Sequence, residues 1–282
     1  MSFFDCTEQE AQWRQEREDL NRKLHENGKQ FLDRKGIEKT RQKFRLGPTL
    51  ESKRYIFSSD SDGVAIICLP IPKMMAKRCY AIGKELTELL PRERETGNAV
   101  AYVTRLELMH VTLFHTSHPN DIAPNARRHF PQDVAQLKTM CTRIAPFRMI
   151  PVKVLMTSTG AIVMLFECLS SIEKLSNQLI NMHAEYSIDY IRHAAKKTFS
   201  YIPKTDTRVI IHSTLGRILS PDVHDNDLAR LHARCEEISI QLAADPQPVL
   251  FDRLWFVEET HFLSLLGPKT EIPLLGDRYL SN

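Results

Sequence analysis

Apolar residues follow two different spacings along this chain. Short apolar runs bounded by turn residues predict buried strands, as at 64–69, where VAIICL is followed by Pro70 and Pro72. Residues 149–157 and 161–169 flank a Ser-Thr-Gly turn and predict a hairpin. Residues 249–258 and 260–266 predict a closing hairpin in the same way. Apolar positions three and four apart predict helices over 73–90, 132–144, 171–185 and 225–243.

The first part of the chain is charged and helical in pattern. Trp13, Leu20, Leu24 and Phe31 form a narrow apolar stripe in this part. We therefore expect a charged helical N-terminal extension over 1–46, followed by a main domain over 47–282. The extension can pack on the domain or on a protein partner. The basic stretch 34–54, which begins in the extension and continues into the main domain, fits contact with an RNA backbone and fits a solvated face.

Two stretches share one short motif. Residues 106–116 read LELMHVTLFHT and residues 208–219 read RVIIHSTLGRIL, and both contain His-x-Thr-Leu. Each lies in an apolar, β-branched run, which predicts buried strands over 100–116 and 209–219. Side chains two apart on a strand share a face, so His110 projects with Thr112, and His212 with Thr214. Two such strands side by side would present two imidazoles and two hydroxyls to one cleft.

These four side chains suit chemistry at a phosphodiester. One imidazole can take a proton near neutral pH while the other gives one. The threonine hydroxyls can hydrogen-bond the non-bridging phosphate oxygens, where charge builds in the transition state. His110 and His212 are thus candidate catalytic residues and Thr112 and Thr214 candidate substrate-binding residues, with no metal or cofactor required. Which histidine is the acid and which is the base stays open.

Further candidates follow each motif. Strict alternation places Phe114 on the His110 face, where it can stack on a base or pack in the core. Arg217 can add positive charge at the phosphate, form a salt bridge or face solvent. His115 is expected on the opposite face, outside the cleft. His118 and His129 follow across a loop without a carboxylate at metal-ligand spacing, so no metal site is predicted.

The motifs HVTL and HSTL resemble the paired His-x-Thr-x signatures of the two-histidine (2H) phosphoesterase superfamily. The resemblance extends over about 63–268, and the Arg of HSTLGR resembles a basic residue that often follows the second motif there. It implies an α+β fold with two pseudo-symmetric lobes, whose antiparallel sheets form a central cleft with helices outside. The order of predicted elements repeats along the chain, with the lobes exchanging near 145–170. The resemblance also implies an RNA or nucleotide partner with a cyclic or terminal phosphate.

Composition narrows the class of protein without identifying the substrate. The net charge of +3 and the 42% hydrophobic content are ordinary for a soluble globular protein. No apolar run is long enough to span a membrane, and the N-terminus does not resemble a signal peptide. The six cysteines include no C-x-x-C pair, which fits a reducing cytoplasmic or nuclear setting.

The sequence therefore predicts a metal-independent cyclic phosphodiesterase or RNA-end phosphoesterase. Hydrolysis, ligation and transesterification all fit the four motif residues. Two other functions stay open: a non-catalytic module that binds RNA ends or nucleotides, and an interaction protein that works through its N-terminal helix. Substrate selectivity is expected in the loops at 91–99, 117–131 and 186–206.

Overall fold

The computed structural model describes residues 7–30, 32–57, 59–93, 95–117, 126–169, 184–199 and 210–275. These residues form an α+β structure built on antiparallel sheets. The α-helices and 3₁₀ turns are α1 (Thr7–Gln30), α2 (Arg34–Arg41), α3 (Lys73–Glu88), η1 (Leu106–Leu108), α4 (Ala126–Cys141), η2 (Ala184–Tyr186), α5 (Ser187–Thr198) and α6 (Asp225–Ala244). The strands are β1 (Phe44–Arg45), β2 (Glu51–Ser52), β3 (Val64–Pro70), β4 (Ala101–Val103), β5 (His110–Ser117), β6 (Phe147–Met156), β7 (Ala161–Cys168), β8 (His212–Ile218), β9 (Val249–Phe251), β10 (Arg253–Glu259) and β11 (Lys269–Pro273).

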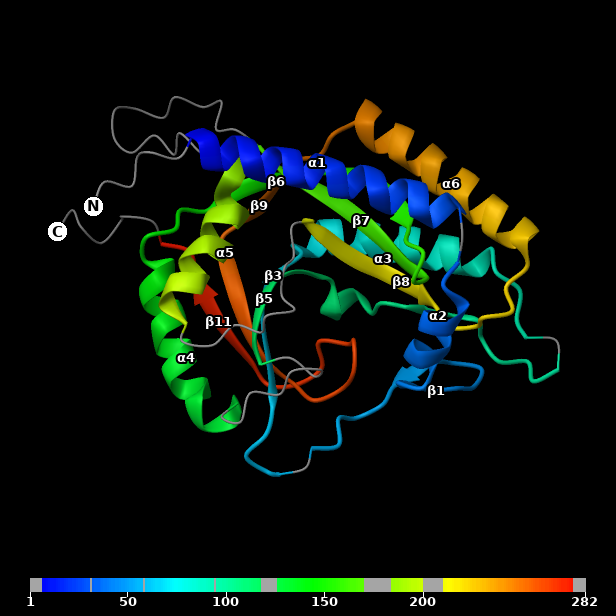
Figure 1. The fold of residues 1–282 in the computed structure, drawn as a ribbon, viewed down its shortest axis with the longest axis horizontal. Helices are drawn as coiled ribbons and strands as arrows, with labels where there is room; N and C mark the ends of the chain where they lie inside the picture. Colours follow the sequence, from blue (N-terminus) through cyan, green and yellow to red (C-terminus); the bar gives the residue numbers. More distant parts are fainter. Residues whose placement is uncertain are drawn as a thin grey trace.

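Two antiparallel sheets organise the fold (Figure 1). The four-stranded sheet has the order β11-β10-β3-β5, and the five-stranded sheet has the order β4-β8-β7-β6-β9. The two motif strands, β5 and β8, belong to different sheets and lie beside each other where the sheets meet. The short β1–β2 hairpin lies outside both sheets.

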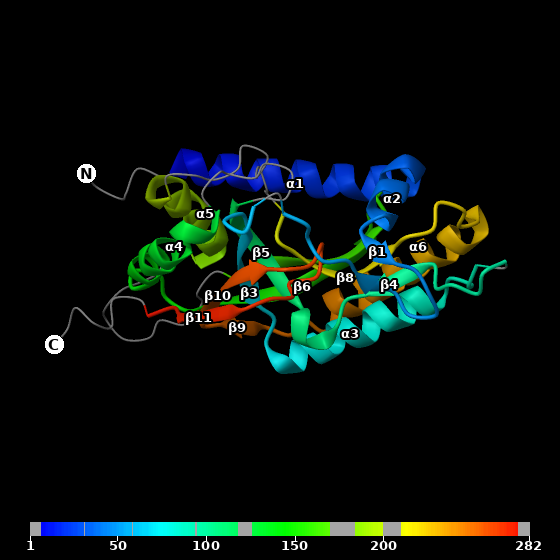
Figure 2. The same ribbon diagram turned by 90° about the horizontal axis from the view of Figure 1, so that it is seen from below.

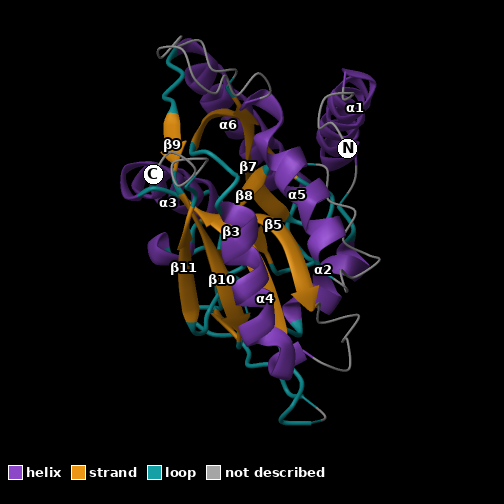
Figure 3. Cartoon of the chain, turned by 90° about the vertical axis from the view of Figure 1, so that its left-hand side faces the viewer, coloured by secondary structure: helices purple, strands orange, loops and turns teal. Residues whose placement is uncertain are grey.

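The largest apolar cluster of the described residues lies behind both sheets. Helices α3 and α6 pack on the five-stranded sheet, and α4 crosses the four-stranded sheet (Figure 3). The predicted stripe of α3, with Met75, Cys79, Ile82 and Leu86, is buried in this core. The core also takes one face of β5 and one face of β8. The opposite faces of the two motif strands therefore point away from the core.

Each sheet combines segments from both halves of the chain. The hairpin β6–β7 pairs through β7 with β8, the second motif strand. The hairpin β10–β11 pairs through β10 with β3, which in turn pairs with β5, the first motif strand. The C-terminal hairpin thus completes the sheet of the first motif, and the middle hairpin completes the sheet of the second.

Most predicted elements are confirmed, but the first motif strand is shorter than predicted. The stretch 100–116 is not one strand, because β4 ends at Val103 and the turn η1 intervenes before β5 begins at His110. The stretch 186–206 was predicted to be a loop, but its described part contains helix α5. The helix predicted over 171–185 falls almost wholly outside the described residues.

The closing hairpin also differs from the prediction. The stretch 249–258 is divided at Asp252, because β9 pairs with β6 in one sheet and β10 pairs with β3 in the other. Residues 260–266 form a loop instead of a strand, and the true partner of β10 is β11. The loop turns through Leu263 and Leu265, both at positive φ, and buries Leu265 against Ile66 and Val257. The apolar stretch 260–266 thus buries Leu265 from a loop and not from the predicted strand.

The N-terminal helix packs on the rest of the fold. Trp13 contacts the rings of Tyr186, Tyr190 and His193, and α1 lies on the side of the sheets opposite α3 (Figure 2). Near its end, a β-carbon on Gly28 would stand 2.1 Å from the backbone oxygen of Met156, so only glycine permits this approach. Packing on the domain, one of the two expected roles of the extension, is therefore present in the structure.

Candidate active site

A buried arginine joins the two motif strands. The Arg192 side chain of α5 donates from Nε to the carbonyl of Leu113 and from Nη2 to the carbonyl of Thr112, both at 3.1 Å. Nη2 also donates to the carbonyl of Ile210, just ahead of β8, at 3.1 Å. One guanidinium thus bonds the backbone of both motif segments. Sequence reasoning missed Arg192, and no local pattern marks it, because its partners are backbone atoms from distant segments.

A β-bulge follows the threonine in both motif strands. Thr112 lies opposite Cys68, but the next pair is Phe114 with Ile67, so Leu113 is an extra residue. In the second strand Thr214 lies opposite Val163 and Gly216 lies opposite Ile162, so Leu215 is an extra residue. Both leucines are buried in the core, with 1% and 0% of their surface exposed. The leucine that ends each motif is thus the bulge residue, which breaks the simple alternation of faces.

The bulge corrects two predictions in the first motif. Phe114 does not share the His110 face; it packs in the core against Phe199, with ring centroids 5.4 Å apart. The expectation that His115 lies on the opposite face is also wrong. His115 lies opposite Ile66, on the face of β3 that Cys68 and Pro70 share with Thr112 and His110. His115 is therefore on the His110 face and Phe114 is not.

The bulge in the second strand brings Arg217 onto the His212 face. His212, Thr214 and Arg217 lie opposite Leu165, Val163 and Ala161, which alternate along β7 and so share one face. His115 and Arg217 thus occupy matching positions, each five residues after the motif histidine. The sequence does carry this signal, because HVTLFH and HSTLGR both end in a basic residue at that spacing.

Arg217 is a half-buried cation with no countercharge among the residues that the structure describes. Among the described residues it forms no ion pair, and burial alone lowers its pKa to about 10. It still carries its charge at neutral pH, since the pKa lies well above 7. A cation that has lost water and gained no anion favours the binding of an anionic ligand.

A backbone contact orients His110. Its Nδ1 lies 2.7 Å from the carbonyl oxygen of Leu108 in η1. A carbonyl can only accept, so Nδ1 carries the proton and Nε2 is the nitrogen that can exchange a proton with a substrate. The 3₁₀ turn that interrupts the predicted strand thus supplies the group that fixes the imidazole.

The four motif side chains differ in exposure but share one relation to the core. Thr112 is buried, with 7% of its surface exposed, while His110, His212 and Thr214 are partly exposed. All four lie on strand faces that point away from the shared core. The structure thus places the two predicted His-Thr pairs on neighbouring strands, and each pair faces away from the shared core.

The remaining candidates lie elsewhere. His129 is on α4, and His118 falls outside the described residues. Within the described part of the chain, no group of three or more His, Cys, Asp or Glu side chains is placed to hold a metal ion. None of its helices combines the length and apolarity needed to cross a membrane.

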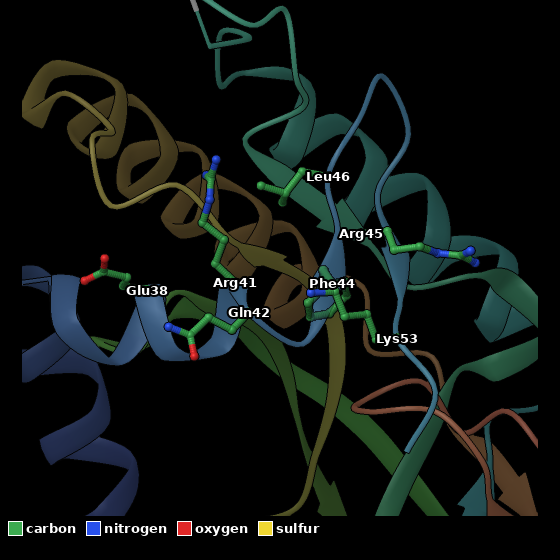
Figure 4. A pocket seen from close by; sticks show the side chains of 7 residues that line it. All are labelled: Glu38, Arg41, Gln42, Phe44, Arg45, Leu46 and Lys53. Atoms are coloured by element: carbon green, nitrogen blue, oxygen red, sulfur yellow. The ribbon is translucent and has the colours of Figure 1, made fainter. Parts of the chain in front are cut away.

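A pocket of about 600 Å³ lies between α2 and the β1–β2 hairpin (Figure 4). Its arginines already have partners, because Arg41 binds Glu93 at 2.6 Å and Arg45 binds Glu51 at 2.7 Å. It is lined by Glu38, Arg41, Gln42, Phe44, Arg45, Leu46 and Lys53. None of these residues belongs to the two motif strands, so the pocket is distinct from the candidate active site.

Comparison with known proteins identifies similar folds. No family model matches the chain, and no curated protein matches it. The conserved protein of unknown function ATU0111 from Agrobacterium tumefaciens has a TM-score of 0.50 and 15% identity, over 80% of this chain and 94% of its own. The protein TT0787 of Thermus thermophilus has a TM-score of 0.48 and 12% identity, over 76% of this chain and 100% of its own. At these identities the similarity concerns the fold alone.

Proposed function

We propose that this protein is a metal-independent phosphodiesterase of the 2H type, acting on a 2′,3′-cyclic phosphate or another RNA-end phosphodiester. In this proposal the two sheets are the cores of two pseudo-symmetric lobes, and β5 and β8 line the cleft between them. The main support is that both His-x-Thr-Leu strands carry a bulge at the same residue and turn the histidine and the threonine away from the shared core.

Each side chain has a role in the proposed reaction. One histidine takes a proton from water as its oxygen attacks phosphorus, and the other donates a proton to the ribose oxygen as the P–O bond breaks. Thr112 and Thr214 donate hydrogen bonds to the non-bridging oxygens, and Arg217 balances their negative charge. The Nδ1 contact with Leu108 leaves Nε2 of His110 for proton transfer in either role.

The test is hydrolysis of a 2′,3′-cyclic nucleotide in EDTA by wild type, His110→Ala and His212→Ala. Each histidine variant is expected to lose about a hundredfold or more in rate, the scale for a general acid or base. His224→Ala is the matched control, because His224 is exposed ahead of α6 and away from the motif strands. A histidine variant as active as this control would refute the proposed mechanism. An inactive wild type that still binds RNA ends would favour the non-catalytic binding module.

A further inference from the structure

The segment that follows α2 links the two sheets on the side of the candidate site. We call residues 42–57 the arm. Phe44 of the arm packs on Tyr102 of the five-stranded sheet, with ring centroids 5.2 Å apart. Further along, the backbone N–H of Phe262 donates to the carbonyl oxygen of Lys53 at 3.0 Å. The backbone N–H of Tyr55 donates to the carbonyl oxygen of Thr260, also at 3.0 Å. The arm is thus fastened both to β4 and to the loop that follows β10.

The beginning of the arm lies beside the second motif strand. Tyr102 pairs with Arg217 across β4 and β8, so Phe44 packs on the face that carries Arg217. Lys43 directly precedes Phe44, and its ammonium lies 5.6 Å from the centre of the Phe262 ring. The pKa of Lys43 is lowered by burial and then by the positive charge of Arg217. The extension therefore places a second cation next to Arg217.

More cations gather around the loop after β10. His261 forms a β-bridge with Arg54, and its pKa is lowered by burial and then by the charges of Arg54, Arg45 and Arg105. Arg105 stands just ahead of η1, the turn that orients His110. These positive charges come from segments far apart in the sequence, and the fold brings them together.

Few of these charges are neutralised by other described residues. Arg45 is paired with Glu51, whereas Lys43, Arg54, Arg105 and Arg217 form no ion pair with any described residue. Glu259 partly offsets the charge effect on Lys43, and its carboxylate also accepts hydrogen bonds from Tyr55 and from the backbone of Leu265. Unpaired like charges held close together favour the binding of an anion with several charges.

We propose that Lys43, Arg54 and Arg105 form, next to Arg217, a second phosphate-binding subsite for the backbone of a single-stranded oligoribonucleotide. This inference rests on the proposed function and refines its substrate class. A cyclic mononucleotide has one phosphate, which the His-Thr pairs engage. Cations that lie beyond the His-Thr pairs gain a ligand only when the RNA substrate carries further phosphates.

The test compares two substrates with the variant Lys43→Ala/Arg54→Ala. One substrate is a 2′,3′-cyclic mononucleotide, and the other is an oligoribonucleotide of about ten residues that ends in the same cyclic phosphate. We expect the ratio of kcat/KM for the oligonucleotide to that for the mononucleotide to fall about tenfold, since two phosphate contacts are lost. Lys73→Ala/Lys77→Ala is the matched control. It removes the same charge from exposed positions on α3, behind the five-stranded sheet, and should leave the ratio unchanged.

Binding separates this inference from the proposed function. Fluorescence anisotropy with an oligoribonucleotide ending in a 3′-phosphate measures affinity without turnover. For the arm variant, the dependence of log Kd on log salt should become shallower by roughly 0.7 for each lost phosphate contact. An unchanged slope together with an unchanged substrate ratio would overturn the subsite while leaving the catalytic proposal intact. If wild type cleaves neither substrate, the catalytic proposal fails. The subsite is then tested by binding alone: a shallower dependence of log Kd on log salt in the arm variant supports it, and an unchanged dependence overturns it.

Discussion

Replacing Arg192 tests whether one side chain holds the motif strands together. In Arg192→Met the carbonyls of Leu113, Thr112 and Ile210 lose a charged donor in a buried setting. An unsatisfied buried carbonyl costs about 1 kcal/mol or more, so the free energy of unfolding should fall by about 3 kcal/mol. Arg192→Lys should lower the free energy of unfolding by less than Arg192→Met. The ammonium keeps the positive charge, but it lacks the planar set of donors that reaches both motif segments.

Urea unfolding followed by tryptophan fluorescence measures this loss. Lys196→Met is the control, since Lys196 is exposed on the same helix and its replacement should change stability by less than about 0.5 kcal/mol. If Arg192→Met is no less stable than Lys196→Met, the guanidinium does not hold the strands. If the proposed catalysis is correct, the folded Arg192→Met protein should also be slower by about a hundredfold, because the catalytic groups shift relative to each other.

Three further predictions concern the extension and the core. The hydrogen bond from Arg41 lowers the pKa of Glu93 to about 2. The pair therefore stabilises the fold above about pH 4.5 and is lost as the pH falls toward 2, so Glu93→Gln should cost roughly 2 kcal/mol at pH 7 and little near pH 2 in urea unfolding curves. Gly28→Ala should lower the Tm despite its better helix propensity, because its β-carbon would meet the backbone of Met156; an unchanged Tm would mean that α1 does not pack so closely. Burial raises the pKa of the described cysteine thiols, so iodoacetamide should label them only after unfolding; rapid native labelling seen by peptide mass spectrometry would contradict the buried placement of Cys68, Cys79, Cys141, Cys168 and Cys235.

The sequence pattern correctly predicted the elements that are encoded within a single segment. The apolar spacing of α3 and α6, the run of β3 and the glycine turn of the β6–β7 hairpin are all readable without tertiary contacts. In each case one segment carries the whole signal, either as a stripe that must be buried or as a turn that needs positive φ, as at Gly160. The His-x-Thr pairs are readable for the same reason, since neighbours two apart on a strand share a face.

Tertiary structure decided what depends on a partner strand. Strict alternation placed Phe114 in the site and His115 outside it, but a bulge exists only relative to the strand opposite, and it reversed both positions. The division of 249–258 between two sheets likewise depends on which strands are adjacent. Arg192 carries no local signal, because its partners are backbone carbonyls of distant segments. The basic stretch 34–54 is readable from the sequence, but its position beside Tyr102, Arg217 and His261 depends on the fold. The sequence by itself thus determined which chemical groups are available, and the fold decided which of them share one side of the sheets.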